Sequence, residues 1–447
     1  MASAVCMALN FTASAERKEN GDFKRIRVPE NVGKSRILIV GGSGAVGRNT
    51  AAALSKLCPN LHIIIGGRNR DKGARVVETL GYNSEFAYVD IEDVNSINAA
   101  MTDVDLVVHA AGPFEYADCN VLEAAIRSKT AYIDVSDSER YARQAKSYKS
   151  KAMAAGVPAI TNCGVGPGDS ENINYVELAK MLFLDLQFTL CIFLVTVMAA
   201  MLVHTAESES RGQPERLRFH YFTAGSGGTG PAVLATSIFL FGDEAVTYHK
   251  GTKMKSSPYS NMLSIDFGEG IGKKEVFLLN LAEVESTHEV LGVPTVSARF
   301  GTAPFFWNWA ISALIKQFPA EYLRDKNIVQ RLVPVAYPII RAMDAISGET
   351  FSIKVDLQCS DGCNTAAVFS HKRLSEAAGT ATAAFVIAVL EGSTKPGVWF
   401  PEEPEGIAIE ARETLLRRAA KGATESFCRR EQTEEMDPLE KSNWIVQ

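Results

Sequence analysis

The sequence of 447 residues lacks the short motifs that bind zinc or form disulfide frameworks. Its eight cysteines include no C-x-x-C pair, and its seven histidines include no H-x-x-x-H pair. We therefore assign no metal site, and we expect the closest cysteines, Cys359 and Cys363, to remain free thiols. The sequence also has no long block of lysine and arginine, and its formal net charge is −6. Nucleic-acid-binding proteins usually carry a basic face, so no nucleic-acid partner is expected.

The first fifteen residues, MASAVCMALNFTASA, contain no charged side chain. Small apolar residues mixed with serine and threonine, without acids, are typical of organelle transit peptides. A secretory signal fits less well, because the segment has no basic start and no unbroken apolar core. We therefore expect residues 1–33 to be a transit-like or disordered N-terminus. The expected location is the chloroplast or another plastid, with the cytoplasm as the alternative.

Short β-branched runs alternate with helical stretches between residues 34 and 165. The runs are RILIVGG, LHIIIGG, EFAYVD, VDLVVHAAG, AYIDV and VPAITN. Continuous apolar runs of this length suit strands that are buried on both faces of a parallel sheet. Strands that alternate with helices imply right-handed crossovers. We predict an α/β domain of the Rossmann type, with a doubly wound parallel sheet.

The pattern changes after Gly164, where longer runs alternate polar and apolar residues. RLRFHYFTAG, FSIKVDLQCSDG and TAAVFSHKRL predict half-exposed antiparallel strands, and Asp361-Gly362 is a turn signal. We predict an α+β domain over residues 166–390, for substrate binding or for formation of a homodimer. Residues 391–424 are expected to return to the first domain. The charged tail, 425–447, is expected to fray.

A glycine motif follows the first predicted strand. GGSGAVG has the G-x-G-x-x-G spacing and stands between that strand and the head of a helix. In a dinucleotide site the first glycine permits the tight turn, the second lets the pyrophosphate approach, and the third lets the helix pack closely. The helix N-terminus then offers N–H groups and a partial positive charge to the phosphates. The predicted cofactor-binding residues of this turn are Gly42, Ser43, Gly44, Ala45, Val46 and Gly47.

The end of the second predicted strand indicates which dinucleotide binds. An NAD site usually has an acidic residue there to hold the ribose 2′-hydroxyl. Here the strand ends in Gly66, Gly67 and Arg68, with Arg70 nearby and no carboxylate before Asp71. Arginine can bind a 2′-phosphate through paired, charge-assisted hydrogen bonds, so NADP(H) is favoured over NAD(H). The alternative is that the two arginines only solvate the start of the next helix.

Two further strand ends should line the same crevice, since ligands bind beyond the carboxyl ends of the strands. YVDIED puts Asp90 near the expected adenine position. HAAGPF supplies small residues that let a cofactor lie against the backbone. Both segments also fit ordinary loop chemistry. The residues predicted to line the cofactor here are Asp90, Ala110, Ala111 and Gly112.

Catalytic residues remain unassigned, because no nucleophile–base arrangement is visible. Hydride transfer needs a group that exchanges a proton beside the nicotinamide. AYIDVSDSERY ends the fifth strand near that point, so Asp134 and Asp137 are candidates for orienting substrate or relaying a proton. The alternative is that Asp137 or Ser138 caps the next helix.

Four features of the second domain are weaker candidates for contact with a ligand. His288 and His371 could face a substrate. The glycine-rich loop at 223–231 could bind an anion, although a turn-and-cap role is favoured. The aromatic segment 304–309, PFFWNW, could line an apolar pocket, although core packing is favoured.

The motifs GGSGAVG, GGRN, VDLVVHAAGPF, AYIDVSD, CGVGPGDS, FTAGSGGTGP and VLEGSTKPGVWFPEEP together resemble the saccharopine dehydrogenase family, specifically the plant saccharopine dehydrogenase-like oxidoreductases. The resemblance implies an NADP-binding Rossmann domain, a second α+β domain and a returning C-terminal segment. The expected function is an NADP(H)-dependent oxidoreductase that transfers hydride to or from an imine or carbonyl type of small molecule in the interdomain cleft. The alternative is a non-catalytic dinucleotide-binding or membrane-associated protein that retains the fold.

An uncharged run, LQFTLCIFLVTVMAAMLV, interrupts this resemblance. Residues 171–196 have no counterpart in the family pattern, so we interpret them as an apolar insertion joined to a buried helix from Val197. A spanning helix needs about twenty mainly apolar residues, and Asp185 and Gln187 interrupt one end of the run. Spanning is therefore disfavoured. Weak membrane association through residues 181–203, self-association and a disabling insertion are the alternatives.

Overall fold

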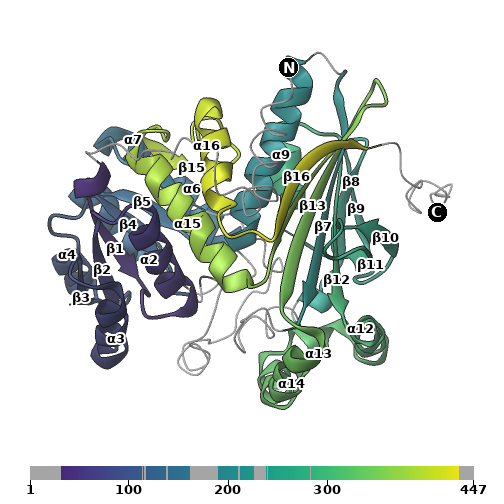
Figure 1. Ribbon diagram of the computed structural model, residues 1–447, viewed down its shortest axis with the longest axis horizontal. Coiled ribbons are helices and arrows are strands. Elements are labelled where there is room, and N and C mark those ends of the chain that lie inside the picture. Colours follow the sequence, from purple (N-terminus) through teal and green to yellow (C-terminus); the bar gives the residue numbers. More distant parts are fainter. Residues whose placement is uncertain are drawn as a thin grey trace, which may run out of the picture. The chain divides into compact units, whose positions relative to one another are not determined.

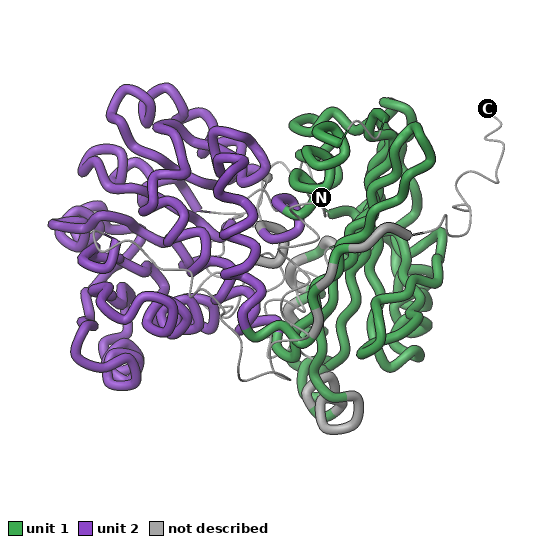
Figure 2. Tube along the Cα trace, turned by 45° about the horizontal axis from the view of Figure 1, so that its top comes forward, with its two compact units in different colours: residues 1–15, 198–373, 422–447 green, residues 16–197, 374–421 purple. Residues whose placement is uncertain are grey.

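The chain forms two compact units, which Figure 2 shows in different colours. The computed structural model describes residues 32–112, 114, 117–136, 139–161, 190–209, 212–225, 238, 240–281 and 283–431. The first unit, which we call the parallel-sheet unit, contains the described residues from 32 to 197 together with Leu374–Lys421. The second, the mixed-sheet unit, contains the described residues of Met198–Arg373 and those from Gly422 onward.

Seven strands in the described part of the parallel-sheet unit form one parallel sheet, in the order β15-β6-β5-β4-β1-β2-β3. The order reverses between β1 and β4, which is the arrangement of a doubly wound sheet. The predicted fold class is thereby confirmed. The strands are β1 Arg36–Val40, β2 His62–Gly67, β3 Ser84–Tyr88, β4 Leu106–His109, β5 Ala131–Asp134, β6 Pro158–Ile160 and β15 Gly397–Trp399.

Helices cover this sheet because its central strands are apolar on both faces. In β1, the side chains from Ile37 to Val40 are all buried. α2 and α15 lie side by side on one face (Figure 1). Right-handed crossovers place α4 to α7 on the opposite face, because the strand order reverses after β3. The helices are α2 Ala45–Leu57, α3 Arg70–Leu80, α4 Val94–Ala100, α5 Asn120–Ser128, α6 Glu139–Ser147, α7 Lys149–Ala155, α15 Leu374–Leu390 and α16 Ile409–Ala419.

The mixed-sheet unit is built on a sheet of nine described strands. Seven follow the order β10-β11-β12-β7-β13-β14-β16, while β8 pairs with β12 and β9 with β8. β7 and β12 run parallel, and the other strand pairs in the described part of this sheet are antiparallel. The predicted hairpin around Asp361-Gly362 is the β13–β14 pair. The strands are β7 Pro214–Ala224, β8 Ala245–His249, β9 Thr252–Ser256, β10 Leu263–Asp266, β11 Lys273–Leu278, β12 Thr295–Ala303, β13 Thr350–Cys359, β14 Asn364–His371 and β16 Glu425–Glu431.

One apolar cluster of this unit lies where β7, β10 and β11 meet. Phe222, Phe267 and Val276 belong to it and are almost fully buried. In this unit the helices occur at irregular intervals between the strands. In the parallel-sheet unit, by contrast, strands and helices alternate regularly. Besides the part of α9 (Leu190–Ser208) from Met198 onward, the described helices of the mixed-sheet unit are α11 Glu283–Leu291, α12 Phe306–Gln317, α13 Ala320–Arg324 and α14 Lys326–Ser347. This mixture is the predicted α+β class.

Two boundaries differ from those that the sequence pattern predicted. α15 belongs to the parallel-sheet unit, so the returning segment begins at Leu374 rather than at 391. α15 packs so closely on α2 that it needs a glycine at the contact: a side chain on Gly379 would lie 2.5 Å from the backbone carbon of Asn49 on α2. Residues 425–431 do not fray, because they form β16 and pair with β14. Cys359 and Cys363 are not joined by a disulfide, as predicted.

The apolar run that interrupts the family resemblance is described only in part. α9, Leu190–Ser208, contains the run from Leu190 onward, and the side chains from Leu194 to Val203 are at most 4% exposed. Residues 162–189 lie outside the described part of the chain. Within the described part, no helix combines the length and apolarity that crossing a bilayer requires.

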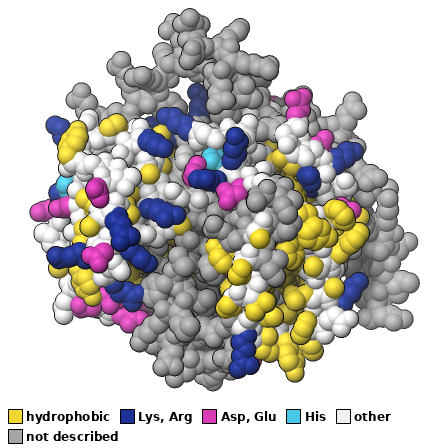
Figure 3. Space-filling view, turned by 60° about the horizontal axis from the view of Figure 1, so that its bottom comes forward, with side chains coloured by type: hydrophobic (Ala, Val, Ile, Leu, Met, Phe, Trp, Pro, Cys, Tyr) yellow, Lys and Arg dark blue, Asp and Glu magenta, His cyan; other side chains and the backbone are white. Residues whose placement is uncertain are grey.

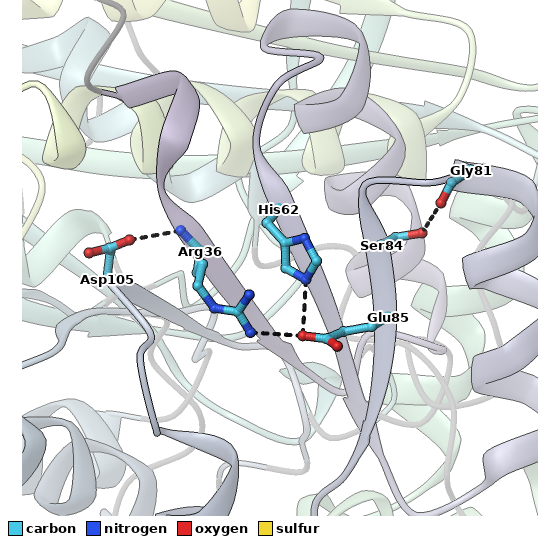
Figure 4. A network of polar contacts seen from close by, with 6 residues as sticks. All are labelled: Arg36, His62, Gly81, Ser84, Glu85 and Asp105. Atoms are coloured by element: carbon cyan, nitrogen blue, oxygen red, sulfur yellow. Dashed lines mark hydrogen bonds and ion pairs between the residues drawn. The ribbon is translucent and has the colours of Figure 1, made fainter.

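A polar network joins the amino ends of β1, β2 and β3 (Figure 4). Arg36 Nη2 donates to Glu85 Oε1 at 2.8 Å, and His62 Nε2 lies 2.9 Å from the same oxygen. The hydrogen bond with His62, followed by the one with Arg36, lowers the pKa of Glu85 despite its partial burial. Asp105 accepts from the Arg36 backbone N–H at 2.8 Å. The network therefore fixes the strand starts at the edge opposite to the glycine turn.

Glu85→Gln should destabilise the protein at neutral pH and have a smaller effect in acid. A carboxylate whose pKa is lowered by folding contributes stability above its unfolded pKa and loses it as the pH falls through its folded pKa. The loss at pH 7 should not exceed about 1 kcal/mol, because the network is partly exposed. Denaturant unfolding of wild type and variant from pH 7 to below the ordinary value of 4.5 measures the difference.

Glu78→Gln, which changes an exposed carboxylate on α3, is the matched control and should leave stability almost unchanged. If the two variants lose equal stability at every pH, the network has no specific role.

Candidate functional site

The turn after β1 is tied to β2 by its backbone. Gly41 has φ of +80°, and a side chain there would lie 2.5 Å from the carbonyl oxygen of Ala110. The N–H groups of Gly41 and Gly42 both donate to Gly66 O, at 2.9 and 3.1 Å. The sequence assigned the tight turn to Gly42, but the left-handed residue is Gly41. A glycine pair is therefore needed before the helix.

The two later glycines of the motif have different surroundings. A side chain on Gly47 would lie 2.4 Å from Gly41 O and 2.6 Å from Gly42 Cα, so α2 packs directly on the turn. Gly44 is the N-cap of α2, and a side chain there would meet only Gly41 O, at 3.1 Å. The first turn of α2 contains no acidic residue. The helix N-terminus thus presents open space and its positive dipole end at the carboxyl edge of the sheet.

Arg68 directly follows β2, at the strand end that neighbours the glycine turn. Its side chain and that of Arg70 are exposed. The cap of the following helix is made by Asn69, whose Oδ1 accepts from Lys72 N at 2.9 Å. Helix capping therefore does not require Arg68. Its position next to Gly67 agrees with the predicted contact to a 2′-phosphate.

The remaining predicted lining residues follow β3 and β4. Asp90 is half-buried, and its Oδ1 accepts from Glu92 N at 3.2 Å, so part of its role is to shape the loop. Ala110 continues from β4, and its N–H donates to Val40 O at 2.8 Å. Ala111 and Gly112 come next and are also half-buried. Pro113 lies outside the described residues.

Asp134 ends β5, two strands away from β1, and pairs in register with His109. Its side chain is fully buried, and Oδ1 accepts from Ser136 N at 3.1 Å. This bond fixes the turn at the carboxyl end of β5. The other catalytic candidate, Asp137, lies outside the described residues, as does the helix-capping alternative Ser138.

A buried polar cluster surrounds Asp134. The hydroxyls of Tyr132 and Tyr141 are 2.8 Å apart and hydrogen-bonded, and Cys119 also hydrogen-bonds to Tyr141. Burial and then the charge of Asp134 raise the pKa of both phenols well above their ordinary value. The same two causes raise the pKa of the Cys119 thiol to about 12. All three groups therefore stay protonated at neutral pH, and Cys119 is not an activated nucleophile.

His109, the last residue of β4, is fully buried beside Phe114, with ring centroids 4.7 Å apart. Burial lowers the pKa of His109 to about 3, so the imidazole is neutral. Its Nδ1 accepts a long hydrogen bond, 3.4 Å, from Ala111 N. The neutral ring thus supports the loop that contains the predicted lining residues.

The weaker candidates for ligand contact in the second domain fall into three groups. Two have partners within the fold, one lies outside the described residues, and the aromatic segment is largely exposed. His288 stacks on Tyr248 with centroids 3.8 Å apart, and its Nδ1 bonds to Val293 O at 2.8 Å. His371 Nδ1 accepts from Arg373 N at 3.0 Å. Loop residues 226–231 lie outside the described part. Core packing of the aromatic segment is wrong for three of its residues, since Phe305, Phe306 and Trp309 are exposed.

Gly41, His109 and the Tyr132–Tyr141 pair were missed by sequence reasoning. The doubled glycine before the motif was a usable signal for Gly41. His109 stands at the end of an apolar strand, and its neighbourhood depends on packing that the sequence does not display.

The edge formed by these strand ends fits a bound dinucleotide. Gly44 leaves room beside a helix N-terminus, Ala110 to Gly112 are small, and Arg68 supplies a cation at the β2 end. These are the features that a pyrophosphate, a flat nicotinamide and a 2′-phosphate require.

Comparison with known proteins agrees with this geometry. Residues 37–160 match the family model of the saccharopine dehydrogenase NADP-binding domain. The prestalk A differentiation protein A of Dictyostelium discoideum is 34% identical over 82 residues, which are 18% of this chain and 27% of that protein. The chain thus spans about a quarter of that relative's length.

A solved apo structure of saccharopine dehydrogenase (L-Glu forming) from Saccharomyces cerevisiae superposes with a TM-score of 0.59. The match covers 89% of this chain and 100% of that chain, at 13% identity. An identity this low establishes a shared fold and no more. Residues 37–160 of this protein are thus similar to the NADP-binding domain of saccharopine dehydrogenases.

Proposed function

We propose that the protein is an NADP(H)-dependent oxidoreductase acting on a small molecule with an imine or carbonyl group. The observation that carries this proposal is the position of the G-x-G-x-x-G turn, where the strand order reverses between β1 and β4. Ligands of doubly wound sheets bind at this position. When bound, NADP(H) supplies or accepts a hydride. The expected cleft between the two domains stays a prediction.

Each predicted residue has a distinct task in this proposal. Gly44 gives the pyrophosphate access to the N-terminus of α2, and Gly47 holds that helix against the turn. Arg68 pairs with the 2′-phosphate. Ala110 to Gly112 give a flat wall for the nicotinamide half. Asp134 is a positioning residue, because its buried carboxylate fixes the turn after β5 through Ser136 N.

Location and assembly are further proposals. The acid-free first fifteen residues, in which serine and threonine stand among small apolar residues, support import into a plastid. A homodimer through the second domain is also retained as a proposal. Import of a fusion of residues 1–33 to a fluorescent protein would test the first, and sedimentation of the purified chain the second.

A turnover assay tests the oxidoreductase proposal. The purified chain should oxidise NADPH with at least one member of a panel of imino and oxo acids, aldehydes and ketones. If it binds NADPH tightly but turns over none, the non-catalytic dinucleotide-binding protein becomes the better description.

Arg68→Ala should weaken NADPH binding and leave NADH binding unchanged. A charge-assisted hydrogen bond contributes about 1.5–3 kcal/mol, so the dissociation constant for NADPH should rise roughly tenfold or more. Nicotinamide fluorescence measures both constants. Arg75→Ala removes the same charge from an exposed position on α3 and is the control. If Arg68→Ala keeps the preference for NADPH over NADH, other residues discriminate between the two dinucleotides.

Gly44→Ala and Gly47→Ala should separate cofactor binding from stability. Gly44 has φ of −73° and ψ of 172°, which alanine adopts, so its variant should fold with little change in Tm and bind NADPH at least about tenfold more weakly. Gly47→Ala inserts a methyl against Gly41 O, so it should also lower the free energy of unfolding by roughly 1–3 kcal/mol. Calorimetry and fluorescence titration measure the two effects. Tight NADPH binding by Gly44→Ala would contradict the assigned pyrophosphate position.

A further inference from the structure

The helices α12, α13 and α14 of the mixed-sheet unit expose a group of large apolar side chains. Figure 3 brings forward the part of the molecule where these helices lie in Figure 1 and shows hydrophobic side chains gathered on one face. Phe305, Trp309 and Val335 are 62%, 65% and 67% exposed. We call the following residues the aromatic patch: Phe305, Phe306, Trp309, Phe318, Tyr322 and Val335.

The first turn of α12 reverses the usual surface-helix pattern, in which polar side chains face solvent and apolar ones face the core. Its polar residue Asn308 is 3% exposed, while Phe306 and Trp309 face outward. Tyr259 Oη donates to Asn308 Oδ1 at 2.6 Å, and Thr302 N donates to the same oxygen at 3.1 Å. Turning the helix to bury its aromatic rings would break both bonds and leave a buried amide unpaired. The exposure of the rings is therefore built into the anchoring of the helix.

The exposed rings also hold one another in place. Phe305 makes edge contacts with Phe306 and with Trp309, whose centroids lie 6.1 and 5.1 Å away. Such contacts stabilise an aromatic cluster without burying it. The cluster is thus ordered before any partner arrives, which lowers the entropic cost of docking.

The charge around the patch selects its partner. The charged side chains described between Phe306 and Ser347 are the exposed Lys316, Glu321, Asp325 and Arg331, and Lys316 is the one charged residue of α12. No acid occurs from Thr302 to Ala320, and Lys316 and Arg331 are exposed. A second copy of α12 would offer Lys316 no acidic partner, because that helix contains no carboxylate. An anionic bilayer attracts the basic residues and accepts the rings at its headgroup boundary.

We propose that the aromatic patch docks the mixed-sheet unit on an anionic lipid surface. α12 has 12 residues, too few to span a bilayer, so its axis would lie in the plane of the headgroups. Phe305, Phe306 and Trp309 would enter the acyl boundary, while Lys316 and Arg331 contact lipid phosphates. This association is independent of residues 181–203 and of the dinucleotide site.

Vesicle flotation of the full chain tests the proposal. Vesicles of three parts phosphatidylcholine to one part phosphatidylserine should bind the wild type, and pure phosphatidylcholine should bind it much less. Trp309→Ser combined with Phe305→Ser should weaken binding roughly tenfold or more, because the rings supply most of the buried apolar area. Lys316→Glu should weaken binding to the anionic vesicles only.

Tyr82→Ser is the matched control, since Tyr82 is 92% exposed in the parallel-sheet unit and lies outside the patch. Its binding should equal that of the wild type, and far-UV circular dichroism and thermal unfolding of every variant report whether both units are folded. Absence of flotation with either vesicle, or equal flotation of the double variant, overturns the proposal. A wild-type dimer that the double variant converts to a monomer, without lipid, would assign the patch to a second copy and also overturn it.

Discussion

The contact between α2 and the turn after β1 is the constraint on which the parallel-sheet unit depends. No side chain fits between Gly47 and Gly41 O, so the helix starts directly above the strand end. The same turn is bonded to β2 through Gly66 O and approaches the backbone of Ala110 after β4. Three strand ends are thereby gathered around one helix N-terminus. The position of the positive dipole end then follows from backbone packing alone.

Local patterns in the sequence predicted the parts of the fold that local physics determines. Buried parallel strands must be apolar on both faces, so apolar runs such as RILIV can be recognised as strands from the sequence. The glycine spacing predicted the close helix, because only a hydrogen fits at Gly47. The absence of an acid at the β2 end predicted NADP, which agrees with the family match of residues 37–160. These inferences need no knowledge of distant contacts.

Features that depend on a distant partner could not be predicted in the same way. ESFCRRE reads as a charged tail, and it becomes β16 only because β14 offers an unpaired edge. α15 is apolar on all sides, so its pattern does not say which unit it joins. PFFWNW has the composition of a core segment, and the inward position of Asn308 is decided by Tyr259, 49 residues earlier. The Tyr132–Tyr141 hydroxyl pair likewise arises from packing between a strand and a helix.

The discontinuity of the parallel-sheet unit has a consequence for how the chain is made. Its sheet lacks the neighbour of β6 until β15 is synthesised, and α2 lacks its cover until α15 emerges. The whole of Met198–Arg373 leaves the ribosome in between. Throughout that interval the nascent chain carries an open parallel edge and an uncovered apolar face on α2, both of which promote aggregation. Biosynthesis of this protein should therefore depend on a chaperone that binds the part of the parallel-sheet unit before Met198 until Leu374–Lys421 is synthesised.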